Sequence, residues 1–530
     1  MTCFIISLIT MFLYIFTKSS KALHSLQQNW YNDGNRYIKW INNNLSKVFL
    51  NFDMLFLIVI VIGFLGNIEL QYISWSLFYL ICLFILNREK QQVKIPLKYT
   101  SRVKRLLFTI TIIYLIPIFV ICFTYFEYSL NIYYIVLGLM VYFNYYVVYL
   151  ANIINKPIEK FVYLYYKNKA IKKLKSMNNL NVIGITGSYG KTSSKNILSD
   201  ILNIKYNALP TPKNFNTTYG IMRTINENLD KFTDTFIVEM GAFRIGEIKT
   251  LCDFVKPKYG IITTIGTAHL ETFGSRENIC KGKFELIESL PSDGIGILNG
   301  DDEYQLNYKI KNNCKILMIG INNKKVDLYA DNIKLSNKGM TFEAHFKGDK
   351  KSYQFETKLL GKANIYNILA AVLLGKNLGI SINELIRAVK KVNAVEHRLE
   401  LKKYRNINII DDAYNSNPVG SKMALEVLDL MDGKKIIVTP GMIELGSEQY
   451  NINKKFGEYI SEVCDEVILI GETQTKPIYD GLIEKGYNKK KIHILNDVKK
   501  AFPLMESLSK KDTYVLLEND LPDIFNEKEK

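Results

Sequence analysis

The stretch Gly184-Ile-Thr-Gly-Ser-Tyr-Gly-Lys-Thr192 decides the fold of this chain. It is a glycine-rich turn that ends in Lys-Thr and follows the apolar run from Val182 to Ile185. In such a turn the backbone N–H groups point toward bound phosphates, the lysine reaches the terminal phosphates, and the threonine hydroxyl can bind Mg²⁺. The residues that we expect to hold ATP here are Gly187, Ser188, Gly190, Lys191 and Thr192.

The surroundings of the turn and its glycine spacing are both informative. An apolar strand precedes it, and the segment from Ser193 to Leu202 predicts the helix that such a turn requires. The usual P-loop places its first glycine five positions before the glycine of Gly-Lys, where this chain has Ile185. The spacing therefore indicates a particular kind of nucleotide-binding domain.

Composition limits the class of protein. The 530 residues are enough for about three domains, and 48% hydrophobic with 22% charged residues fits a membrane-attached protein with a large soluble part. Much of the net charge of +17 flanks apolar segments near the N-terminus, so we expect no nucleic-acid partner. The seven cysteines show no close pairs and no metal-ligand spacing, which is typical of buried thiols in a reducing compartment.

About five apolar segments near the N-terminus predict a membrane region. Leu107–Phe126 and Leu130–Leu150 are each about twenty residues, long enough to cross roughly 30 Å of hydrocarbon. Leu70–Leu86 is a good third span, whereas Met54–Ile68 and Met1–Phe16 are short enough to be interfacial or re-entrant instead. A cleavable signal peptide is disfavoured, because the start of the chain lacks basic residues and a small-residue cleavage site.

Lysines and arginines predict how the chain is oriented. Residues 87–106 and residues 156–175 each carry seven basic side chains, and we expect both segments in the cytosol. Five spans with the N-terminus outside satisfy these loops, and the short link at 127–129 then also lies outside. The protein would be a multi-pass cell-membrane protein, with everything after about residue 151 facing the cytoplasm. The aromatic and basic stretch Phe161–Met177 should lie along the bilayer surface or continue the last span as a helix.

From Asn181 onward, short β-rich runs alternate with helical segments, as in an α/β domain with a mainly parallel sheet. The expected elements are strands at Val182–Ile185, Thr235–Glu239, Tyr259–Ile265 and Gly294–Leu298, an antiparallel extension near Val326–Ala330 and Met340–Phe346, a helix at Asn364–Leu378, and, after a polar turn at Asn393–His397, strands at Ile407–Ile410, Lys435–Val438, Glu466–Ile470 and Tyr514–Leu517. We therefore expect an α-helical membrane region at 1–150, a basic membrane-proximal helix or linker at 151–180, a P-loop-type central ATPase domain at 181–395 and a C-terminal Rossmann-like α/β domain at 396–530.

Two further residues stand out because they lie at the ends of strands, and a third, Lys283, gains a role only from the family resemblance described below. Glu239 ends a buried strand at the edge where open α/β sheets bind ligands, so it is the best candidate for an Mg²⁺ ligand, with a helix-capping role as the less favoured alternative. His269 closes the run that starts at Ile261, again at a strand's carboxyl end, and position alone supports a site role and a structural role equally. Lys283, taken by itself, resembles an ordinary solvated lysine.

Seven motifs in order resemble those of the Mur ligase family, the ATP-dependent amide-forming enzymes of peptidoglycan precursor synthesis, and specifically its D-alanyl-D-alanine-adding branch. The resemblance covers roughly residues 181–517. The motifs are Gly184-Ile-Thr-Gly-Ser-Tyr-Gly-Lys-Thr192, Thr211-Pro-Lys-Asn-Phe-Asn216, Glu239-Met-Gly-Ala242, Ala268-His-Leu-Glu-Thr-Phe-Gly-Ser275, Leu298-Asn-Gly-Asp-Asp302, Asn364-Ile-Tyr-Asn367 and Asp411-Asp-Ala-Tyr-Asn-Ser-Asn-Pro418.

The resemblance implies roles for individual residues. Lys191 and Thr192 would hold the terminal phosphates and a first Mg²⁺, and Glu239 would contribute to metal binding. His269 would serve a second Mg²⁺ site, and Lys283 falls where the family carries a carbamylated lysine that positions this second metal. Lys191, His269 and Lys283 would then be the catalytic residues. The remaining residues carried over are Asn364, Asn367, Arg398 and Asp412 for the nucleotide, and Asn214, Asn216, Asn415 and Asn417 for the substrate side.

The reaction that the resemblance implies has two steps. A carboxylate acceptor, a muramyl peptide or a related cell-wall precursor, attacks the γ-phosphate and becomes an acyl phosphate. An amine donor, D-Ala-D-Ala or a similar compound, then attacks the acyl carbon and phosphate leaves. Closure of the C-terminal domain about Asn393–His397 would keep water from the acyl phosphate.

The chain differs from the family in two ways. Membrane spans stand where relatives carry a soluble domain for the uridine nucleotide of the acceptor, which raises the hypothesis of a lipid-linked acceptor. The chain also ends its last strand with Leu517-Glu-Asn-Asp-Leu-Pro-Asp523, where the related branch has a Lys-Gly-Ser stretch. This acidic ending could hold a free ammonium group of the amine substrate, and a plain solvated turn is an equally good interpretation.

Two other functions stay open. Within the same fold, the chain could be a γ-glutamyl-polymer ligase or a specialised peptide ligase. From another class, it could be a non-catalytic ATP-binding membrane scaffold, although the simultaneous presence of all the residues named above argues against a decayed catalytic centre.

Overall fold

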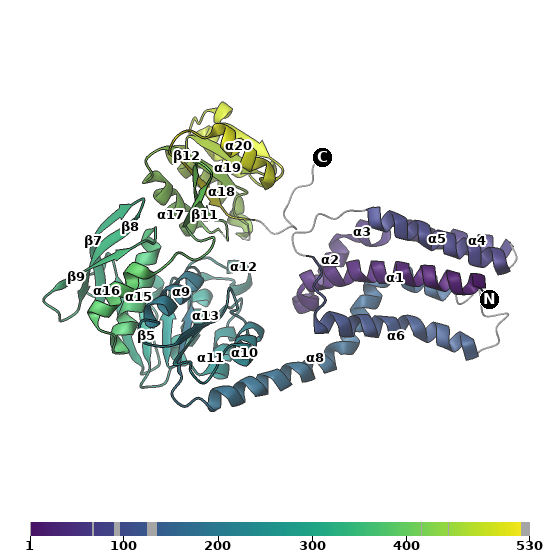
Figure 1. The fold of residues 1–530 in the computed structure, drawn as a ribbon, viewed down its shortest axis with the longest axis horizontal. Helices are drawn as coiled ribbons and strands as arrows, with labels where there is room; N and C mark the ends of the chain where they lie inside the picture. The colour runs from purple at the N-terminus through teal and green to yellow at the C-terminus, as the bar shows by residue number, and fades with distance from the viewer. Residues whose placement is uncertain are drawn as a thin grey trace. The chain divides into compact units, whose positions relative to one another are not determined.

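A computed structural model describes residues 2–65, 68–88, 96–123, 135–414, 416–443 and 445–520. The chain divides into two compact units, residues 1–165 and residues 166–530. The first is helical and the second contains two sheets with helices on their faces (Figure 1).

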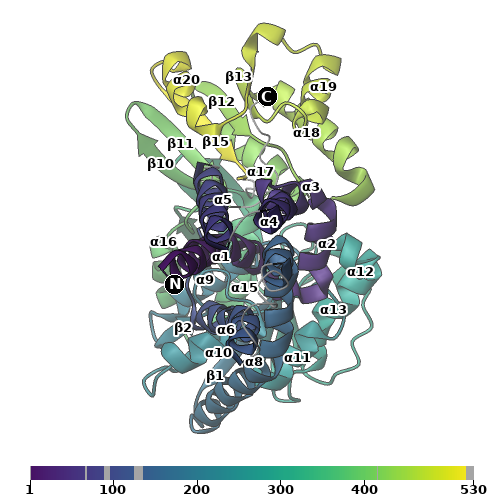
Figure 2. The ribbon, with the colours of Figure 1, turned by 90° about the vertical axis from the view of Figure 1, so that its right-hand side faces the viewer.

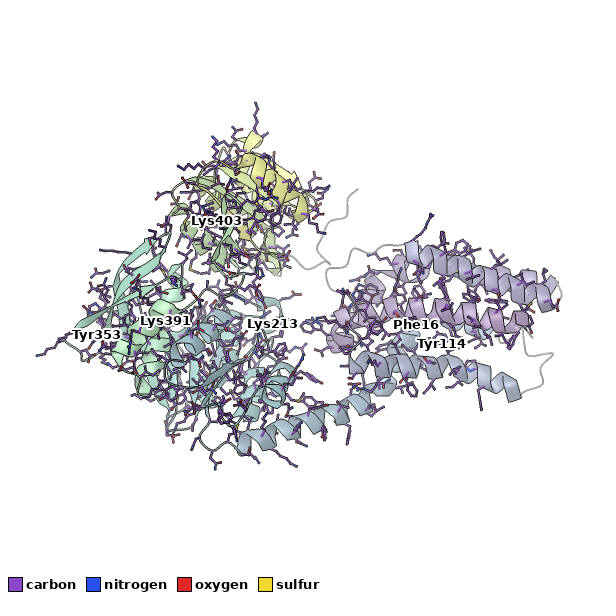
Figure 3. The ribbon with its side chains drawn as sticks, viewed as in Figure 1. Phe16, Tyr114, Lys213, Tyr353, Lys391 and Lys403 are labelled. Atoms are coloured by element: carbon purple, nitrogen blue, oxygen red, sulfur yellow. The ribbon has the colours of Figure 1, made fainter. Side chains whose placement is uncertain are left out.

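The helices of the first unit are α1 (Thr2–Gln28), η1 (Trp30–Asn35), α2 (Arg36–Asn43), α3 (Leu45–Phe49), η2 (Phe52–Leu55), α4 (Phe56–Leu65), α5 (Ile68–Arg88), α6 (Ser101–Phe123), the helix Ile135–Tyr142 and the first part of α8 (Asn144–Lys175). Their interior is mostly aromatic and aliphatic, and it includes Trp75 and Tyr114. Large apolar side chains also cover the outside: Phe16 is 54% exposed, whereas Tyr114 is buried (both are labelled in Figure 3).

Among the described residues, two helices are long and apolar enough to cross a membrane, α1 over Cys3–Gln28 and α5 over Glu69–Arg88. A third is present if the helix Ile135–Tyr142 and α8, which meet at an angle of 82°, are counted as one span. The expectation of a short first segment, Met1–Phe16, was wrong, because α1 continues to Gln28. The total of about five spans stays a prediction, since the link at 127–129 and the ends of the two longest expected spans lie outside the described residues.

The expected span Leu130–Leu150 is not a single straight helix in its described part. The chain bends at Phe143, and the Nζ atom of Lys18 lies 2.9 Å and 3.3 Å from the carbonyl oxygens of Val141 and Tyr142 beside the bend. Lys18 forms an ion pair with Asp53, and both side chains are buried. Apolar periodicity could not reveal this bend, because its stabilising cation comes from a distant helix.

The first sheet of the second unit has nine strands in the order β2-β3-β1-β4-β5-β6-β7-β8-β9. Neighbouring strands are parallel from β2 to β7, and β8 and β9 add an antiparallel extension. The strands are β1 (Asn181–Thr186), β2 (Ala208–Pro210), β3 (Thr235–Glu239), β4 (Tyr259–Ile262), β5 (Ile295–Asn299), β6 (Lys315–Gly320), β7 (Leu328–Ser336), β8 (Gly339–Phe346) and β9 (Ser352–Thr357).

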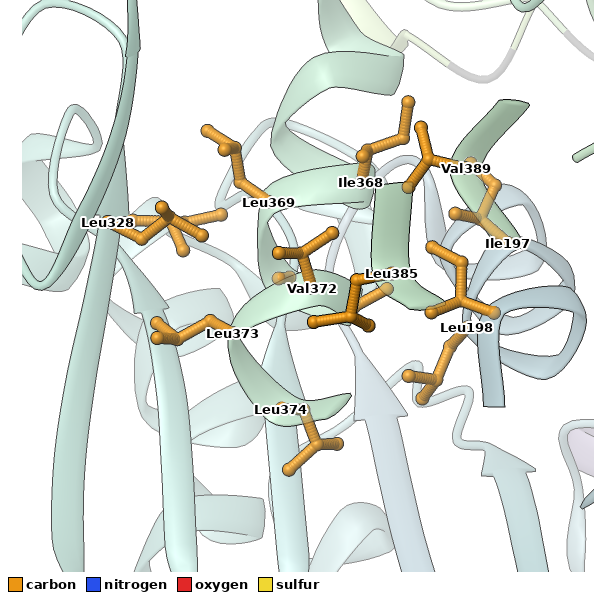
Figure 4. Packing of buried hydrophobic residues seen from close by; sticks show 14 of the residues in the cluster. Ile197, Leu198, Leu328, Ile368, Leu369, Val372, Leu373, Leu374, Leu385 and Val389 are labelled. Carbon is orange, nitrogen blue, oxygen red and sulfur yellow. The ribbon is translucent and has the colours of Figure 1, made fainter. Parts of the chain in front are cut away.

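One face of this sheet is covered by α9 (Lys191–Leu202), α15 (Lys362–Asn377) and α16 (Ile382–Lys391). Leu369, Val372 and Leu373 of α15 pack there between β7 and the apolar faces of α9 and α16 (Figure 4). The other helices of this domain are α10 (Thr218–Glu227), α11 (Glu247–Val255), α12 (Leu270–Phe273), α13 (Arg276–Glu288) and α14 (Glu303–Leu306). The last turns of α8 also belong to this unit, and Asn226 Nδ2 donates to the carbonyl of Tyr166 at 3.0 Å.

A stripe of glycines sets the position of α13. Gly184, Gly260 and Gly296 lie side by side in register on β1, β4 and β5. A Cβ atom at any of them would approach Leu286 or Ile287 of α13 to 3.1 Å or less. The missing side chains therefore allow α13 to pack closely on the sheet. Gly184, the first glycine of the opening motif, thus has a packing role.

The second sheet has the order β10-β11-β15-β12-β13-β14, and all neighbours are parallel except β10 and β11. Its strands are β10 (Glu400–Tyr404), β11 (Ile407–Asp412), β12 (Lys434–Thr439), β13 (Glu466–Ile470), β14 (Ile492–Leu495) and β15 (Thr513–Glu518). Helices α17 (Pro418–Asp429), α18 (Gln449–Val463) and α19 (Lys476–Glu484) pack on one face and α20 (Ala501–Leu508) on the other (Figure 2).

Candidate active site

The glycine-rich turn lies where the sequence predicted it, between β1 and α9. Gly187 has φ +151° and Gly190, at the start of α9, has φ +77°. A Cβ atom at Gly187 would lie 2.0 Å from Thr263 Oγ1, so the backbone at this position approaches the segment after β4 more closely than any side chain would allow. The turn thus presents backbone N–H groups at the N-terminus of a buried helix, which is an anion-binding arrangement.

The turn is held in shape by residues 263–267, which follow β4. Ser188 N donates to Thr264 O at 2.7 Å, and Thr263 Oγ1 donates to Tyr189 O at 2.6 Å. Gly266 N donates to Ser188 Oγ at 2.9 Å. These bonds fix the turn to the segment that follows the neighbouring strand.

Lys191 begins α9 and folds over the turn. Its Nζ atom donates to Gly187 O at 2.7 Å and to Ser188 O at 3.2 Å. Burial lowers the pKa of Lys191 to about 8; the charge of Glu239 opposes this decrease, and Arg398 adds a smaller one. Thr192 follows it and is buried. Hydroxyl and carboxylate oxygens are the hard ligands that Mg²⁺ prefers, so Thr192 and Glu239 fit a magnesium site by their chemistry.

Glu239 ends β3, the neighbour of β1, and is 1% exposed. Its Oε2 atom lies 3.0 Å from Nζ of Lys195, and its Oε1 atom accepts from Asn216 Nδ2 at 3.1 Å. Sequence reasoning missed Lys195. The available signal was its place on the apolar face of α9, three residues before Leu198 and seven before Leu202, where a lysine is unusual.

His269 and Lys283 lie within electrostatic reach of Lys191. His269 precedes α12 in a left-handed conformation, with φ +61°, and its ring centroid lies 4.4 Å from that of Phe243. Burial, Lys191 and Lys283 lower the pKa of His269 to about 4, so the imidazole is neutral and has a lone pair available for a metal. Lys283, on α13, is 1% exposed, and burial with the charge of Lys191 lowers its pKa to about 7. It is therefore not the solvated lysine that its sequence suggests.

The amines of Lys191 and Lys283 and the imidazole of His269 form a group that favours negative charge nearby. The Nζ atom of Lys283 lies 3.5 Å from Ala242 O and 5.6 Å from the ring centroid of Phe273. Lys191 and Lys283 lower the pKa of His269, whereas Glu239 acts on the pKa of Lys191, and Glu247 and Glu285 on that of Lys283, in the raising direction. Phosphate groups or an added carboxylate would be stabilised in this cluster.

The residues expected to hold the nucleotide lie around the start of α9. Asn367 on α15 lies near Gly190, and its Nδ2 atom is 3.4 Å from Asn364 Oδ1. The guanidinium carbon of Arg398 lies 4.4 Å from the ring centroid of Tyr414. A small pocket lies between α9 and the polar turn after α16. The pocket is lined by Ser193, Ile197, Leu359, Asn364, Asn393, Ala394, Val395 and Arg398. Asp412 ends β11, where its Oδ1 atom accepts from Leu399 N at 3.1 Å.

The expected substrate-side asparagines have different surroundings. Asn216 contacts Glu239, as described above, and Asn214 is exposed on the same loop. Asn417 caps α17, because its side chain accepts from Gly420 N at 2.9 Å. Asn415 lies outside the described residues.

Comparisons with known proteins agree with this arrangement. Residues 185–375 match the Mur ligase middle domain, and residues 397–518 match the Mur ligase glutamate ligase domain. The UDP-N-acetylmuramoyl-tripeptide--D-alanyl-D-alanine ligase of Bacillus subtilis is 32% identical over 295 residues, which cover 55% of this chain and 63% of that protein. The protein of the same name from Buchnera aphidicola subsp. Acyrthosiphon pisum is 31% identical over 63% of this chain and 72% of its own length.

A solved structure is also similar. The MurF ligase of Thermotoga maritima, crystallised in complex with ADP, superposes with a TM-score of 0.60 and 26% identity, over 68% of this chain and 80% of that one. The chain thus spans less than two thirds of the length of the Bacillus subtilis relative, and more than two thirds of the length of the Buchnera and Thermotoga proteins.

Proposed function

Because this chain belongs to the Mur ligase family, we propose that it is an ATP-dependent ligase that joins an amine to a carboxylate acceptor of cell-wall precursor type. The observation that carries the proposal is the cluster of the buried Lys283 with the half-buried Lys191 and His269, together with the interaction of Lys191 with Glu239, at the strand edge next to the glycine-rich turn. Bound ATP would supply the phosphoryl group that activates the acceptor, and bound Mg²⁺ would offset its negative charge.

The chain's own residues would hold the phosphates, ligate the metals and exclude water. The N–H groups of the turn and the amine of Lys191 would hold the phosphates in line with the acceptor carboxylate. Thr192 and Glu239 would ligate the first metal and His269 the second. Arg398, beside the turn after α16, would move with the C-terminal domain and help to exclude water.

We propose that Lys283 carries a carbamate. Its neutral amine would attack the carbon of CO₂, form a C–N bond and release one proton. Burial and a pKa of about 7 support the first step, because they keep much of the amine neutral at cytosolic pH. The resulting negative charge would lie among Lys191, His269 and the second metal, where the cluster requires one.

The donor and acceptor follow from the relatives' names. The relatives of Bacillus subtilis and Buchnera join D-alanyl-D-alanine to a UDP-muramoyl-tripeptide by their names, and we propose the same pair for this chain. The lipid-linked acceptor is the alternative, because helices precede the matched region, which starts at residue 185. A γ-glutamyl-polymer ligase remains a second alternative.

We also propose that residues 1–165 anchor the enzyme in the cell membrane, with the ligase domains in the cytoplasm. The apolar exterior of this unit and the two long apolar helices support it. Carbonate-washed membranes should retain the full chain, and its release by alkaline carbonate would contradict anchoring.

The decisive experiment measures phosphate release by the full chain in detergent. A ligase releases phosphate from ATP only when both a carboxylate acceptor and an amine donor are present. UDP-muramoyl-tripeptide with D-Ala-D-Ala is the first pair to test, and a lipid-linked muramoyl peptide is the second. Nucleotide binding without turnover on any such pair would favour the scaffold alternative instead.

A further inference from the structure

Lys195 and Glu239 form a fully buried ion pair beside the glycine-rich turn. The side chains are 1% and 2% exposed, and Nζ lies 3.0 Å from Oε2. Lys195 stands one helical turn after Lys191 on α9, the helix whose N-terminus faces the phosphate site. No role for Lys195 follows from the motifs or from the comparisons.

The same ammonium group also contacts the loop on the substrate side. Lys195 Nζ donates to the backbone carbonyl of Lys213, in the loop that follows β2 (Lys213 is labelled in Figure 3). Two further bonds join this loop to Glu239: Asn216 Nδ2 donates to Oε1 at 3.1 Å, and the backbone N–H of Glu239 donates to Thr211 Oγ1 at 3.2 Å. Lys195 therefore links the helix of the turn, the strand-end carboxylate and the loop.

The energetics argue that the pair is more than a packing element. Removing two charges from water costs several kcal/mol per ion, and a buried pair of this kind is often no more stable than apolar residues of similar volume. Its place at the carboxyl edge of β3, next to the turn, is where a fixed carboxylate is useful. Each carboxylate oxygen has two lone-pair sites, and the described contacts use one on each, so one on each remains for a cation.

We propose that Lys195 is a positioning residue: it holds the Glu239 carboxylate in one orientation for a divalent cation and couples that orientation to the acceptor-side loop at 211–217. The inference rests on the proposed function for the identity of the metal and of the acceptor. The contacts that Lys195 makes in the structure do not depend on either of these identities.

The orienting role and a purely electrostatic role of Lys195 predict opposite changes in cation affinity when Lys195 is removed. If Lys195 acted only through its charge, its removal would strengthen cation binding, because one repulsive charge would be lost. If it acts by orientation, its removal frees the carboxylate and weakens binding, as the loss of groups that orient metal ligands does by about 10- to 100-fold. The sign of the change therefore decides between the two roles.

The test uses the full chain in detergent, with Mn²⁺ as the probe, and measures bound Mn²⁺ by electron paramagnetic resonance in the presence of ADP. We expect Lys195→Met to weaken Mn²⁺ binding about 10-fold or more. Lys195→Gln, which keeps a hydrogen-bond donor without the charge, should recover part of this loss. Unchanged or tighter Mn²⁺ binding by Lys195→Met would overturn the proposal, and so would a Lys195→Gln variant as weak as Lys195→Met.

A matched control removes another Lys–Glu pair. Lys434 lies 3.2 Å from Glu466 in the second sheet, and both side chains are largely buried. Lys434→Met should leave Mn²⁺ binding within about twofold of the wild type, since its described partners, Glu466 and the carbonyl of Leu508, are not among the proposed Mg²⁺ ligands. An equal loss in both variants would assign the effect to general destabilisation and overturn the proposal. If Lys195→Met does not fold, the sign is read from Lys195→Gln against the wild type.

The coupling to the loop is tested separately by turnover. Lys195→Gln should raise KM for the acceptor about 5-fold or more and change KM for the amine donor less than twofold. Equal changes in both values would contradict the coupling. Mn²⁺ binding requires no turnover, so a chain that binds Mn²⁺ with ADP but ligates no acceptor would refute the proposed function while leaving this test intact.

Discussion

Asp412 and Glu518 lie opposite each other in register at the carboxyl ends of β11 and β15, so the half-buried carboxyl of Asp412 meets the fully buried carboxyl of Glu518 in the C-terminal domain. Burial raises the pKa of Asp412 to about 6. Burial and the charge of Asp412 raise the pKa of Glu518 well above its usual range, and Ser416 Oγ donates to its Oε1 atom at 2.6 Å. Glu518 is therefore not part of a solvated turn, and it is too deeply buried for an incoming ammonium group to reach it without a conformational change.

This acidic pair predicts a pH dependence of stability. Both pKa values are raised in the folded state, so the folded chain binds more protons than the unfolded chain and its stability falls as the pH rises from about 4 through 6 and beyond. Glu518→Gln removes one of the two charges and should raise Tm at pH 8 by about 3–6 °C, with a smaller gain at pH 5. Differential scanning fluorimetry measures both values, and a gain independent of pH would contradict the pairing.

The close approach at Gly187 predicts a specific sensitivity of nucleotide binding. Gly187→Ala would drive a Cβ atom into Thr263 Oγ1 and break the bonds that hold the turn, so the affinity for a fluorescent ADP analogue should fall about 10-fold or more. Gly348→Ala is the matched control, because Gly348 also has positive φ, +89°, but has open space around it. It should cost about 1 kcal/mol of stability without changing nucleotide affinity.

The proposed carbamate predicts a chemical rescue. Lys283→Ala should lower kcat about 100- to 1000-fold, because the cluster loses its fixed negative group, and short carboxylic acids such as formate or acetate should restore part of the activity. Phosphate release measures both effects. Lys281→Ala, an exposed neighbour on α13, should behave as the wild type. An unimpaired Lys283→Ala enzyme would remove the residue from the mechanism.

The helical unit has its own test. Lys18→Met leaves the buried Asp53 without its cation and should destabilise the unit by about 3–5 kcal/mol, seen as early thermal aggregation in detergent. The double variant Lys18→Met with Asp53→Asn should recover much of this loss, because no unpaired charge remains. Lys104→Met, at an exposed position on α6, serves as the reference. If the double variant were no better than the single one, the ion pair would not be the cause.

Much of the second unit could be predicted from the sequence. Strands such as Thr235–Glu239 and Ile407–Asp412 are apolar runs with clear ends. Because parallel strands place those ends at one edge, the sequence predicts the position of Glu239 at the end of β3. The expected strands omit Ala208–Pro210 and Ile492–Leu495, which are short strands at the sheet edges, and also Lys315–Gly320, an apolar strand in the interior of the first sheet.

The sequence could not predict which charged side chains of different elements would contact one another. Lys195 lies one turn after Lys191, and its partners Glu239 and Lys213 are distant in the chain, so only the strand order β3-β1 brings them together. The burial of Lys283 likewise depends on the approach of α13 to the sheet. Local patterns specify which face is apolar, but not which charged group of another element meets it.

The glycine stripe of Gly184, Gly260 and Gly296 has a consequence for how this site can change over generations. A Cβ atom at any of the three would meet the outer side-chain atoms of Leu286 or Ile287, which would have to repack close to Lys283 on α13. A substitution on β5 would thus reach the neighbourhood of the site through α13. Natural variation should therefore favour small residues along a line that crosses the sheet at right angles to its strands.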